Sequence, residues 1–539
     1  MDKIKLTYPK PIFMVWALWL FLSFINLNKA VHMDDTFHIE AAQEILKNPT
    51  KPMSGKVNWG SNPNYLHSFN QAPLFFYVIA YWGSFFGFNE ISLHLLISIF
   101  TFLALFYFYK ISRLLYPEKS NYLLLLFGLS APFIVNQNIH LDVPFLSLLL
   151  LFFYKILLFS KSKKGIHLLL AALVFSLSLL IKYSVIPLFT VMITALFFSK
   201  KYKYAWMLLV PIAFLTLWSY FNWIEYGSIH FLDRPKNEFT LNRIGGIFII
   251  FTACIGALFP FGFIGLSNFL KPNVNRLLAI TFIFLFTLLC AGVLIGFIPE
   301  KISSIILYAV FIITGLIVIF STIYIVFKNY NFFNIEIKLL SIALFSLSGF
   351  LVVFAPFMAS RHLLLILPFV LWVLNPFFQK TSKIILNLTL LISAFIGITL
   401  GISDWFYADY YRDAAHNISK QTNKPNLYSR GHWGWQWYSK KEGLKEYGKD
   451  STILQVNDLI IGPVNVSKQD LHPSLVLETI YKENPPSTLF TFFSGNDYAS
   501  MYNASSKRTS WKLSKQPIDT IVIMRVKAIK PLTQVKHYN

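Results

Sequence analysis

The sequence predicts an all-α polytopic membrane domain of about thirteen transmembrane helices, followed by a soluble C-terminal α/β domain. Of the 539 residues, 55% are hydrophobic and only 13% are charged, whereas a soluble domain carries roughly 25% charged residues. Apolar runs recur from residue 12 to residue 403, and each is long enough to cross about 30 Å of hydrocarbon. Residues 404–539 have ordinary polar content. We therefore predict a transmembrane domain over 1–403 and an external domain over 404–539.

Charge placement supports this helix count. The predicted helices are 12–28, 91–109, 121–136, 143–160, 166–181, 184–199, 204–222, 246–268, 277–297, 302–327, 339–356, 362–378 and 383–403. With the N-terminus inside, basic loops such as 161–164 and 200–203 also lie inside, and thirteen crossings place the C-terminal domain outside. Asp34, Asp142 and Glu300 then lie outside. One missed helix would reverse this sorting for every later loop, so the positive-inside rule favours the count.

A long first external loop, residues 31–90, has predicted structure of its own. Asp34 to Lys47 is predicted to be helical, with Asp34 or Asp35 capping its N-terminus. Residues 73–88 are short for a span and rich in aromatic side chains, which predicts a helix lying in the membrane interface. Asn26 to Ala30 makes a poor cleavage site, so the first helix is predicted to be an uncleaved anchor.

The net charge of +22 does not predict nucleic-acid binding. The basic residues form short clusters between apolar runs, and none of these clusters lies on a soluble basic domain. Cys254 and Cys290 both fall inside apolar runs, so we interpret them as core residues rather than as a disulfide or metal site.

Acidic residues near the outer surface are the first candidates for chemistry. Asp34 and Asp35 follow the first helix closely, where a carboxylate is able to accept a proton or bind a metal. Asp142 forms a polar group with Asn136, Asn138 and His140 at the outer end of a helix, and such groups are costly to place at membrane depth. The alternative is that these carboxylates only cap and solvate helix ends.

Cations at the outer surface are the second set of candidates. Lys182, Arg361 and His362 interrupt or begin apolar runs and lie outside, against the positive-inside rule. A bound phosphate or pyrophosphate explains them, because Arg offers a bidentate fork and Lys a point charge; snorkelling to lipid headgroups is the alternative. Arg243 belongs to an external loop and is able to join the same pocket, although a solvated loop is the better explanation of this residue. Arg234 and Lys236 from that loop share this prediction.

No cofactor follows from these patterns. Asp34 and His38 lie one helical turn apart and are able to share a divalent metal, but no tight ligand motif such as HExxH occurs. Metal dependence therefore stays unknown.

Five segments, taken in order, resemble a known superfamily. They are MDDTFHIEAAQEIL, QAPLFFYVIAYWGSFFGFNEISLHLLISIF, LDVPFLSLLLLFFY, IKYSVIP and SRHLLLILP. This order resembles the GT-C superfamily of membrane glycosyltransferases over roughly residues 10–400. Within it, the chain is similar to the branch that contains protein O-mannosyltransferases, the lipid A aminoarabinose transferase and the Rgt-type bacterial sugar transferases.

The resemblance implies a polyprenyl-phosphate-linked sugar donor, an active site at the external membrane surface, inversion at the anomeric carbon, and a lipid, glycan or protein acceptor. The family's catalytic acid falls on Asp34, with Asp35 as its neighbour, and its second acid falls on Asp142. Its basic residue corresponds to Lys182, and its Arg-aromatic pair to Arg361-His362. Two positions depart from the common pattern, because Asp35 stands where Glu is frequent and His362 where Tyr is.

The C-terminal domain gives weaker signals. Asp409 to Gln421 is predicted to be helical, and TILQVNDLIIG and TIVIMRV are predicted strands. Trp433, Trp435 and Trp437 alternate, and on a strand they would share one face that is able to stack on sugar, sit at the interface or pack in the core.

Three other functions compete with sugar transfer. A transporter or flippase of lipid-linked saccharides would also need an anionic lipid pocket, but the helix centres are nearly free of charge and no repeat is visible. A glycan-binding membrane scaffold and an oligosaccharide polymerase or ligase are the others. The expected location is a bacterial inner membrane, with the N-terminus cytoplasmic.

Overall fold

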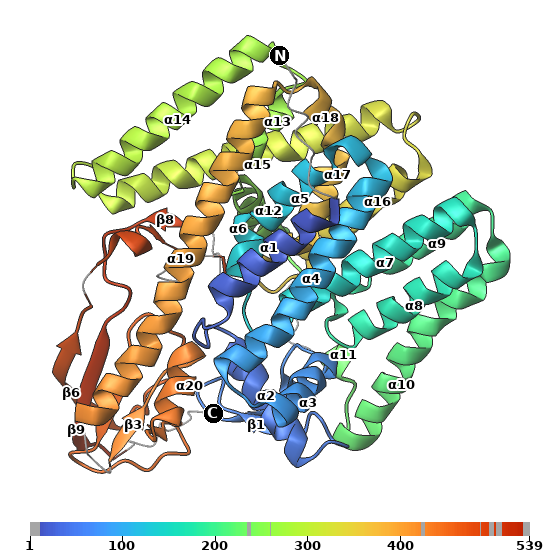
Figure 1. Cartoon of the computed structure of the whole chain (residues 1–539). Helices are drawn as coiled ribbons and strands as arrows, with labels where there is room; N and C mark the ends of the chain where they lie inside the picture. The colour runs from blue at the N-terminus through green and yellow to red at the C-terminus, as the bar shows by residue number, and fades with distance from the viewer. Residues whose placement is uncertain are drawn as a thin grey trace.

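The computed structural model describes residues 11–233, 239–258, 260–421, 426–485, 487–494, 501–502 and 509–531. Arg234 and Lys236 lie outside these ranges. Helices dominate up to residue 421, and strands appear mainly after it (Figure 1). The predicted fold class, a helical polytopic domain followed by a mixed α/β region, is confirmed.

Seven helices in the described part of the chain are long and apolar enough to cross a membrane. They are α4 (Glu90–Leu115), α7 (Asp142–Ser162), α10 (Leu209–Tyr226) with the turn η4 (Tyr202–Leu208) before it, α14 (Pro272–Leu294), α15 (Glu300–Asn329), α16 (Ile335–Phe354) and α19 (Lys383–Gln421). Shorter apolar helices accompany them: α1 (Pro11–Asn26), α3 (Leu74–Phe86), α8 (Gly165–Leu179), α9 (Leu188–Ser199) and α12 (Leu241–Gly256). The chain is therefore a multi-pass membrane protein.

Prolines explain why several predicted helices are broken. The predicted helix 121–136 is divided into α5 (Ser120–Gly128) and α6 (Ala131–Val135), and 184–199 is divided into η3 (Tyr183–Val185) and α9. The predicted helix 246–268 is divided into α12 and α13 (Phe261–Leu266). The predicted helix 362–378 is divided into η5 (Ser360–Leu365), α17 (Leu367–Val373) and α18 (Asn375–Lys380). Pro132, Pro187, Pro260 and Pro368 stand at these breaks. Proline lacks an N–H and clashes with the preceding turn, so a helix restarts there.

Helix α7 forms the centre of the membrane domain. It is 72% buried over its most apolar stretch, whereas α10 and α14 are only 17% buried and present most of their apolar surface to lipid. It packs on α4, α8 and η5, and Asp142 is its first residue. The most buried membrane helix therefore starts at one of the predicted site residues.

Glycines allow α12 and α15 to cross at close range. A Cβ added at Gly256 would collide with the carbonyl oxygen of Phe311, and one added at Gly315 would collide with that of Thr252. Small residues allow membrane helices to approach until their backbones touch, which increases dispersion contacts. These two glycines therefore set the distance between the two helices.

The C-terminal region begins inside a helix. The predicted helices 383–403 and 409–421 are one continuous helix, α19, so the predicted boundary at residue 404 falls within it. Beyond it, a five-stranded mixed sheet has the order β4 (Lys445–Glu446), β3 (Leu427–Ser429), β5 (Leu459–Pro463), β9 (Ile521–Ile529), β6 (Leu475–Glu483). The predicted strand in TIVIMRV is confirmed as β9, whereas only the last four residues of TILQVNDLIIG, 459–462, are in a strand, β5.

The three alternating tryptophans lie on a helix, so the possibility of a strand with one aromatic face is wrong. Helix α20 (Trp433–Lys441) carries Trp433, Trp435 and Trp437. Trp435 is fully buried, and the other two are partly buried. A helical turn spreads these rings around the axis, and Gly431 at φ +134° ends the preceding extended segment.

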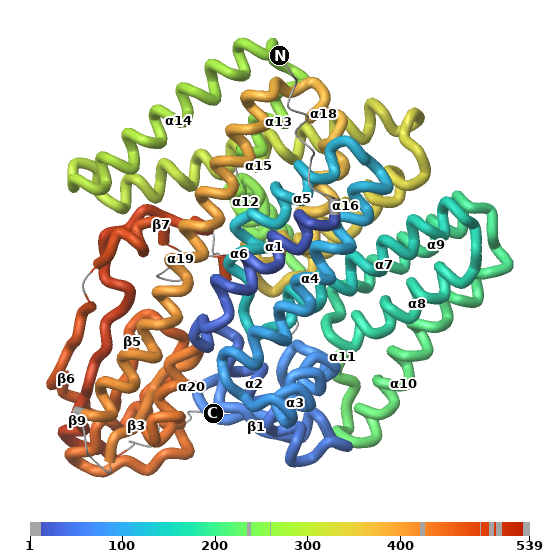
Figure 2. Tube along the Cα trace, in the orientation of Figure 1, coloured from blue at the N-terminus to red at the C-terminus, as the bar shows by residue number. Residues whose placement is uncertain are grey.

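Helix α20 docks on the loop that follows the first helix, residues 31–90. It packs against both α19 and α2 (Asp35–Lys47), as Figure 2 shows. The hydroxyl of Thr36 donates to the Trp433 carbonyl (2.6 Å), and the Val31 N–H donates to the Tyr438 hydroxyl (2.8 Å). Glu40, which is buried in α2, accepts hydrogen bonds from Gln436 (3.0 Å) and Lys440 (3.3 Å). The C-terminal domain thus holds the loop that carries the predicted catalytic acids.

We expect Gly256→Ala to lower the unfolding temperature, because the added methyl group forces α12 away from α15. Gly246→Ala is the matched control, since it lies on the same helix and a Cβ there meets nothing within 4 Å. The control should be neutral or slightly stabilising, because alanine favours helix by about 1 kcal/mol over glycine. Thermal unfolding of both purified variants in detergent checks this. Equal effects of the two substitutions would contradict it.

We expect the stability of the α2–α20 contact to depend on pH. Burial raises the pKa of Glu40 from 4.5 to about 6, although Lys440 opposes the shift. Because the folded protein binds this proton more tightly, the stabilisation is complete below about pH 4.5 and is lost as the pH rises through about 6. The change is about 2 kcal/mol, at about 1.4 kcal/mol for each pKa unit.

Unfolding temperatures measured between pH 4 and pH 7 test this dependence. Glu40→Gln should remove the decline seen in the wild type, and Glu44→Gln, at a partly exposed position of the same helix, should keep it. An identical pH profile for wild type and Glu40→Gln would show that Glu40 is not the titrating group.

Candidate functional site

Four predicted site residues from separate segments meet in one cluster, which we call the acid–cation cluster: Asp34, Asp142, Lys182 and Arg361. An Arg361 guanidinium nitrogen (Nη1) lies 2.6 Å from Asp34 Oδ2, and its Nε lies 3.9 Å from Asp142 Oδ2. Lys182 Nζ lies 3.2 Å from Asp142 Oδ1. Two cations and two carboxylates therefore form one continuous chain of charges.

The cluster is partly shielded from solvent. The side chains of Arg361 and Asp142 are 12% and 10% exposed, and those of Asp34 and Lys182 are each 27% exposed. Arg361 also lies over the ring of Phe357, 5.7 Å from its centroid. Electrostatic interactions are stronger in such a site than in bulk water, so an anionic ligand would be attracted strongly by both Lys182 and Arg361.

A strained turn presents Asp34. Met33 has φ +49°, a conformation rarely adopted by residues other than glycine. Two hydrogen bonds hold the turn: the Asp35 N–H donates to the His32 carbonyl (3.0 Å), and the His32 N–H donates to Asp35 Oδ2 (2.9 Å). Asp34 is the N-cap residue of α2, but its side chain makes no capping bond. Of the two residues predicted to cap the helix, Asp34 occupies the N-cap position without a capping bond because its carboxylate pairs with Arg361. Asp35 accepts from the His32 N–H instead.

The two adjacent aspartates have opposite environments. Burial by itself raises the pKa of Asp34, but Arg361 more than compensates and the net shift is downward. Asp35 is fully buried, and this burial raises its pKa well above the usual value. Asp34 is therefore the ionised acid that belongs to the cluster, whereas Asp35 holds the turn.

Two neutral histidines border the cluster. Burial lowers the pKa of His140 to about 3, and the pKa of His38 is also lowered, mainly by burial. His140 Nδ1 lies 3.6 Å from Asp142 Oδ2, and the rings of His38 and His140 are 6.2 Å apart. His38 Nδ1 lies 2.6 Å from the Asp34 carbonyl oxygen. The other ring nitrogen of His38, Nε2, and both ring nitrogens of His140 have no hydrogen-bond partner within the described ranges. These nitrogens are available for polar groups of a ligand.

Two other predicted binding residues lie outside the ion-pair chain. His362 Nδ1 accepts a hydrogen bond from the Ala359 N–H (3.2 Å), and burial lowers its pKa to about 3. Its ring lies 5.3 Å from that of Phe357, which also faces Arg361. The guanidinium of Arg243 donates to the Val353 (3.1 Å) and Ala355 (2.5 Å) carbonyls. Arg243 therefore holds the C-terminal end of α16 and makes no ion pair with the cluster.

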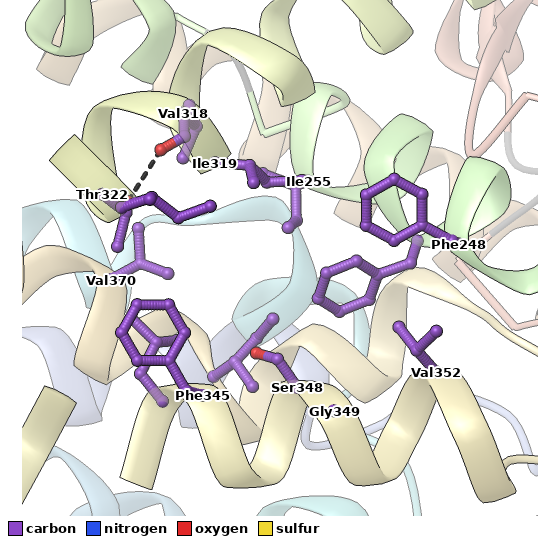
Figure 3. A pocket seen from close by; sticks show the side chains of 14 residues that line it. Phe248, Ile255, Val318, Ile319, Thr322, Phe345, Ser348, Gly349, Val352 and Val370 are labelled. Carbon is purple, nitrogen blue, oxygen red and sulfur yellow. Dashed lines mark hydrogen bonds between the residues drawn. The ribbon is translucent and has the colours of Figure 1, made fainter. Parts of the chain in front are cut away.

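An apolar groove opens between α12, α15, α16 and α17, with a volume of about 300 Å³. Figure 3 shows Phe248 and Phe345 on opposite sides of it. Ile366, which lines the groove, directly follows the η5 segment that carries Arg361. Arg243 binds carbonyls just beyond Val352, another lining residue. An apolar chain in this groove would thus start close to the segment that carries Arg361.

Sequence reasoning missed a second buried group of polar residues. Lys29 Nζ lies 2.5 Å from Asp404 Oδ2 and 2.5 Å from Asn138 Oδ1, and Tyr502 donates to Asp404 (2.9 Å). The signals were a lysine directly after the first apolar run, an aspartate directly after the last one, and Asn138 in the polar group before Asp142. None of these signals predicts that residues so distant in sequence are partners.

Metal binding receives no support from side-chain clustering. Within the described ranges, no group of three or more His, Cys, Asp or Glu side chains is arranged to hold a metal ion. The predicted pair Asp34 and His38 is engaged differently, because the carboxylate of Asp34 binds Arg361.

The fold and this site define a multi-pass membrane protein with an acid–cation cluster beside an apolar groove. The family model described as dolichyl-phosphate-mannose-protein mannosyltransferase matches residues 70–223. The match includes Asp142 and Lys182, and it confirms the predicted resemblance to membrane glycosyltransferases. No curated protein matches the chain.

Two solved structures are similar to the chain at low identity. One is ArnT from Cupriavidus metallidurans bound to undecaprenyl phosphate, with 14% identity, a TM-score of 0.38, and coverage of 84% of this chain and 92% of that one. The other is the archaeal oligosaccharyltransferase AglB from Archaeoglobus fulgidus, in complex with an inhibitory peptide and a dolichol-phosphate, with 11% identity and a TM-score of 0.43. That match covers 83% of this chain and 62% of AglB.

Proposed function

We propose that the protein is a membrane glycosyltransferase that takes a sugar from a polyprenyl-phosphate donor. The acceptor is a lipid, glycan or protein hydroxyl or amine at the external membrane face, and the sugar is transferred with inversion. One observation carries this proposal: an ionised carboxylate, Asp34, and two cations, Arg361 and Lys182, converge in a single cluster. The family match over residues 70–223 supports it.

The two cations are suited to the donor phosphate. Arg361 Nε has no hydrogen-bond partner among the described residues, so it has donor capacity left for a phosphate oxygen. Lys182 is partly exposed, and its one ion pair with a described residue is the one with Asp142. When the bond between the sugar C1 and the phosphate breaks, negative charge grows on the leaving phosphate, and both cations stabilise that charge.

Asp34 is suited to the acceptor. Its depressed pKa keeps it ionised at neutral pH, so it is ready to accept the proton of a hydroxyl as that group attacks C1. A phosphate that binds Arg361 competes with Asp34 for the same guanidinium. Donor binding therefore raises the proton affinity of Asp34 when a base is required.

The neutral histidines are suited to the sugar. His38 and His140 have ring nitrogens without partners in the described structure, and a neutral imidazole both donates and accepts hydrogen bonds. Sugar hydroxyls need such partners once they leave water. The apolar groove along α12 and α16 is suited to the polyprenyl chain, because its lining is almost entirely aliphatic and aromatic.

This reaction sets the expected location. The cluster lies on the face where the sequence-based topology places acidic loops, which is the external face of a bacterial inner membrane, with the N-terminus cytoplasmic. The C-terminal domain lies on the same side as the cluster, because α20 packs on the loop that carries Asp34.

We expect Asp34→Asn to lower sugar transfer about a hundred- to ten-thousandfold, the range that general-base assistance supplies. Folding should persist, because Asp142 still accompanies Arg361. Asp35→Asn should cost less than about tenfold, because an asparagine oxygen is still able to accept the His32 N–H that holds the turn.

The measurement is the release of polyprenyl phosphate from polyprenyl-phosphate sugars by purified wild type and both variants, with melting temperature as the folding control. Near-normal turnover by Asp34→Asn would remove it from the mechanism, and a selective loss in Asp35→Asn would transfer the role to that residue. Movement of the donor between leaflets without sugar release would identify a flippase instead.

A further inference from the structure

A second charge network connects to the segments that carry the acid–cation cluster. Lys29 is 1% exposed and Asp404 is 8% exposed, and their charged atoms are 2.5 Å apart. Lys29 also donates to Asn138 Oδ1 (2.5 Å), and the Asn138 amide donates to the Tyr502 hydroxyl (2.6 Å). Tyr502 donates to Asp404 Oδ2 (2.9 Å) and closes the ring. We call Lys29, Asn138, Asp404 and Tyr502 the buried anchor.

Each of three anchor residues is directly linked to one segment of the site. Lys29 lies five residues before Asp34, and Asn138 lies four residues before Asp142. Tyr502 follows Met501, whose carbonyl accepts the backbone N–H of Arg361 (3.0 Å). The anchor therefore joins the three segments that carry Asp34, Asp142 and Arg361.

The ion pairs of the acid–cation cluster require these segments to keep their positions. A buried cation and carboxylate tolerate little displacement, because neither is able to exchange its partner for water. The fourth anchor residue, Asp404, lies on α19, the long helix that leads into the C-terminal domain. The anchor thus couples that domain to the site through a helix and through the backbone at residues 501–502.

We propose that Lys29, Asn138, Asp404 and Tyr502 are positioning residues that hold Asp34, Asp142 and Arg361 in the geometry needed for sugar transfer. The C-terminal domain, through Tyr502, then forms part of the scaffold of the active site in addition to any contact with acceptor. This inference rests on the proposed function only for the identity of the reaction. The contacts between the buried anchor and the segments of the cluster do not depend on that function.

The central test is Tyr502→Phe, which removes one hydroxyl and leaves the Lys29–Asp404 pair in place. Tyr411→Phe is the matched control, because Tyr411 is also buried and its hydroxyl donates to a carboxylate, that of Asp519 (2.8 Å). We expect Tyr502→Phe to lower kcat at least about tenfold, since small misplacements of reacting groups are costly, while the donor KM changes less than about threefold. Tyr411→Phe should retain kcat.

Amide hydrogen exchange gives a second readout that needs no activity. Tyr502→Phe should increase exchange in peptides covering 136–142 and 359–362, and Tyr411→Phe should not. If wild type transfers no sugar from any polyprenyl-phosphate donor, the proposed function fails, and this exchange pattern alone decides the positional inference.

The paired-charge variants separate positioning from simple stability. Lys29→Met removes the ammonium group that lies 2.5 Å from the buried Asp404 carboxylate. Among the interactions described, that carboxylate keeps only its contacts with Tyr502 (2.9 Å) and His32 (3.3 Å), so the substitution should lower the melting temperature strongly. Adding Asp404→Asn should restore the melting temperature but not kcat. Restoration of both, equal effects of Tyr502→Phe and Tyr411→Phe, or increased exchange throughout the protein would overturn the proposal.

Discussion

The guanidinium of Arg361 is the interaction on which the rest of the site depends. A largely buried cation is stable only when it is paired, and Arg361 meets this condition with a carboxylate at 2.6 Å from one segment and another at 3.9 Å from a second. Because Asp34 and Asp142 are 108 positions apart in the sequence (142 − 34), pairing this one cation brings two distant segments together. Lys182 balances the remaining charge of Asp142.

The surrounding structure fixes the positions of the charged side chains in the acid–cation cluster. The turn at Met33 adopts a backbone conformation that is costly for methionine, and Asp35 supplies the hydrogen bond that maintains it. Helix α20 covers the same loop from the side of the C-terminal domain, and a Cβ at Gly434 would collide with the Val31 carbonyl. The buried anchor supports the same loop through Lys29, which is paired with Asp404 and Asn138. Preorganisation of this kind favours reactions in which charge develops at a defined point.

Much of this arrangement was visible in the sequence. Composition and apolar runs predicted the helical membrane domain, and cations placed against the positive-inside rule marked Lys182 and Arg361. The acids Asp34 and Asp142 were found because ionisable residues at membrane boundaries are costly. The tryptophan segment was misjudged because alternation in three residues does not distinguish a strand from a short helix. Proline breaks within apolar runs were missed for a related reason: mean hydropathy does not report backbone interruption.

Residue types and their local pattern already indicate which segments require a lipid environment and which charged residues stand at the ends of apolar runs, because solvation energies depend on residue type and local pattern. The pairing of those charges follows only from how the segments pack together. In the folded protein Asp34 is ionised, whereas Asp35 is buried and its pKa is raised. Arg243 donates to backbone carbonyls, and Lys29 pairs with Asp404, which is 375 positions away in the sequence. Such pairing depends on distances between segments that pack together in three dimensions, and no local pattern encodes those distances.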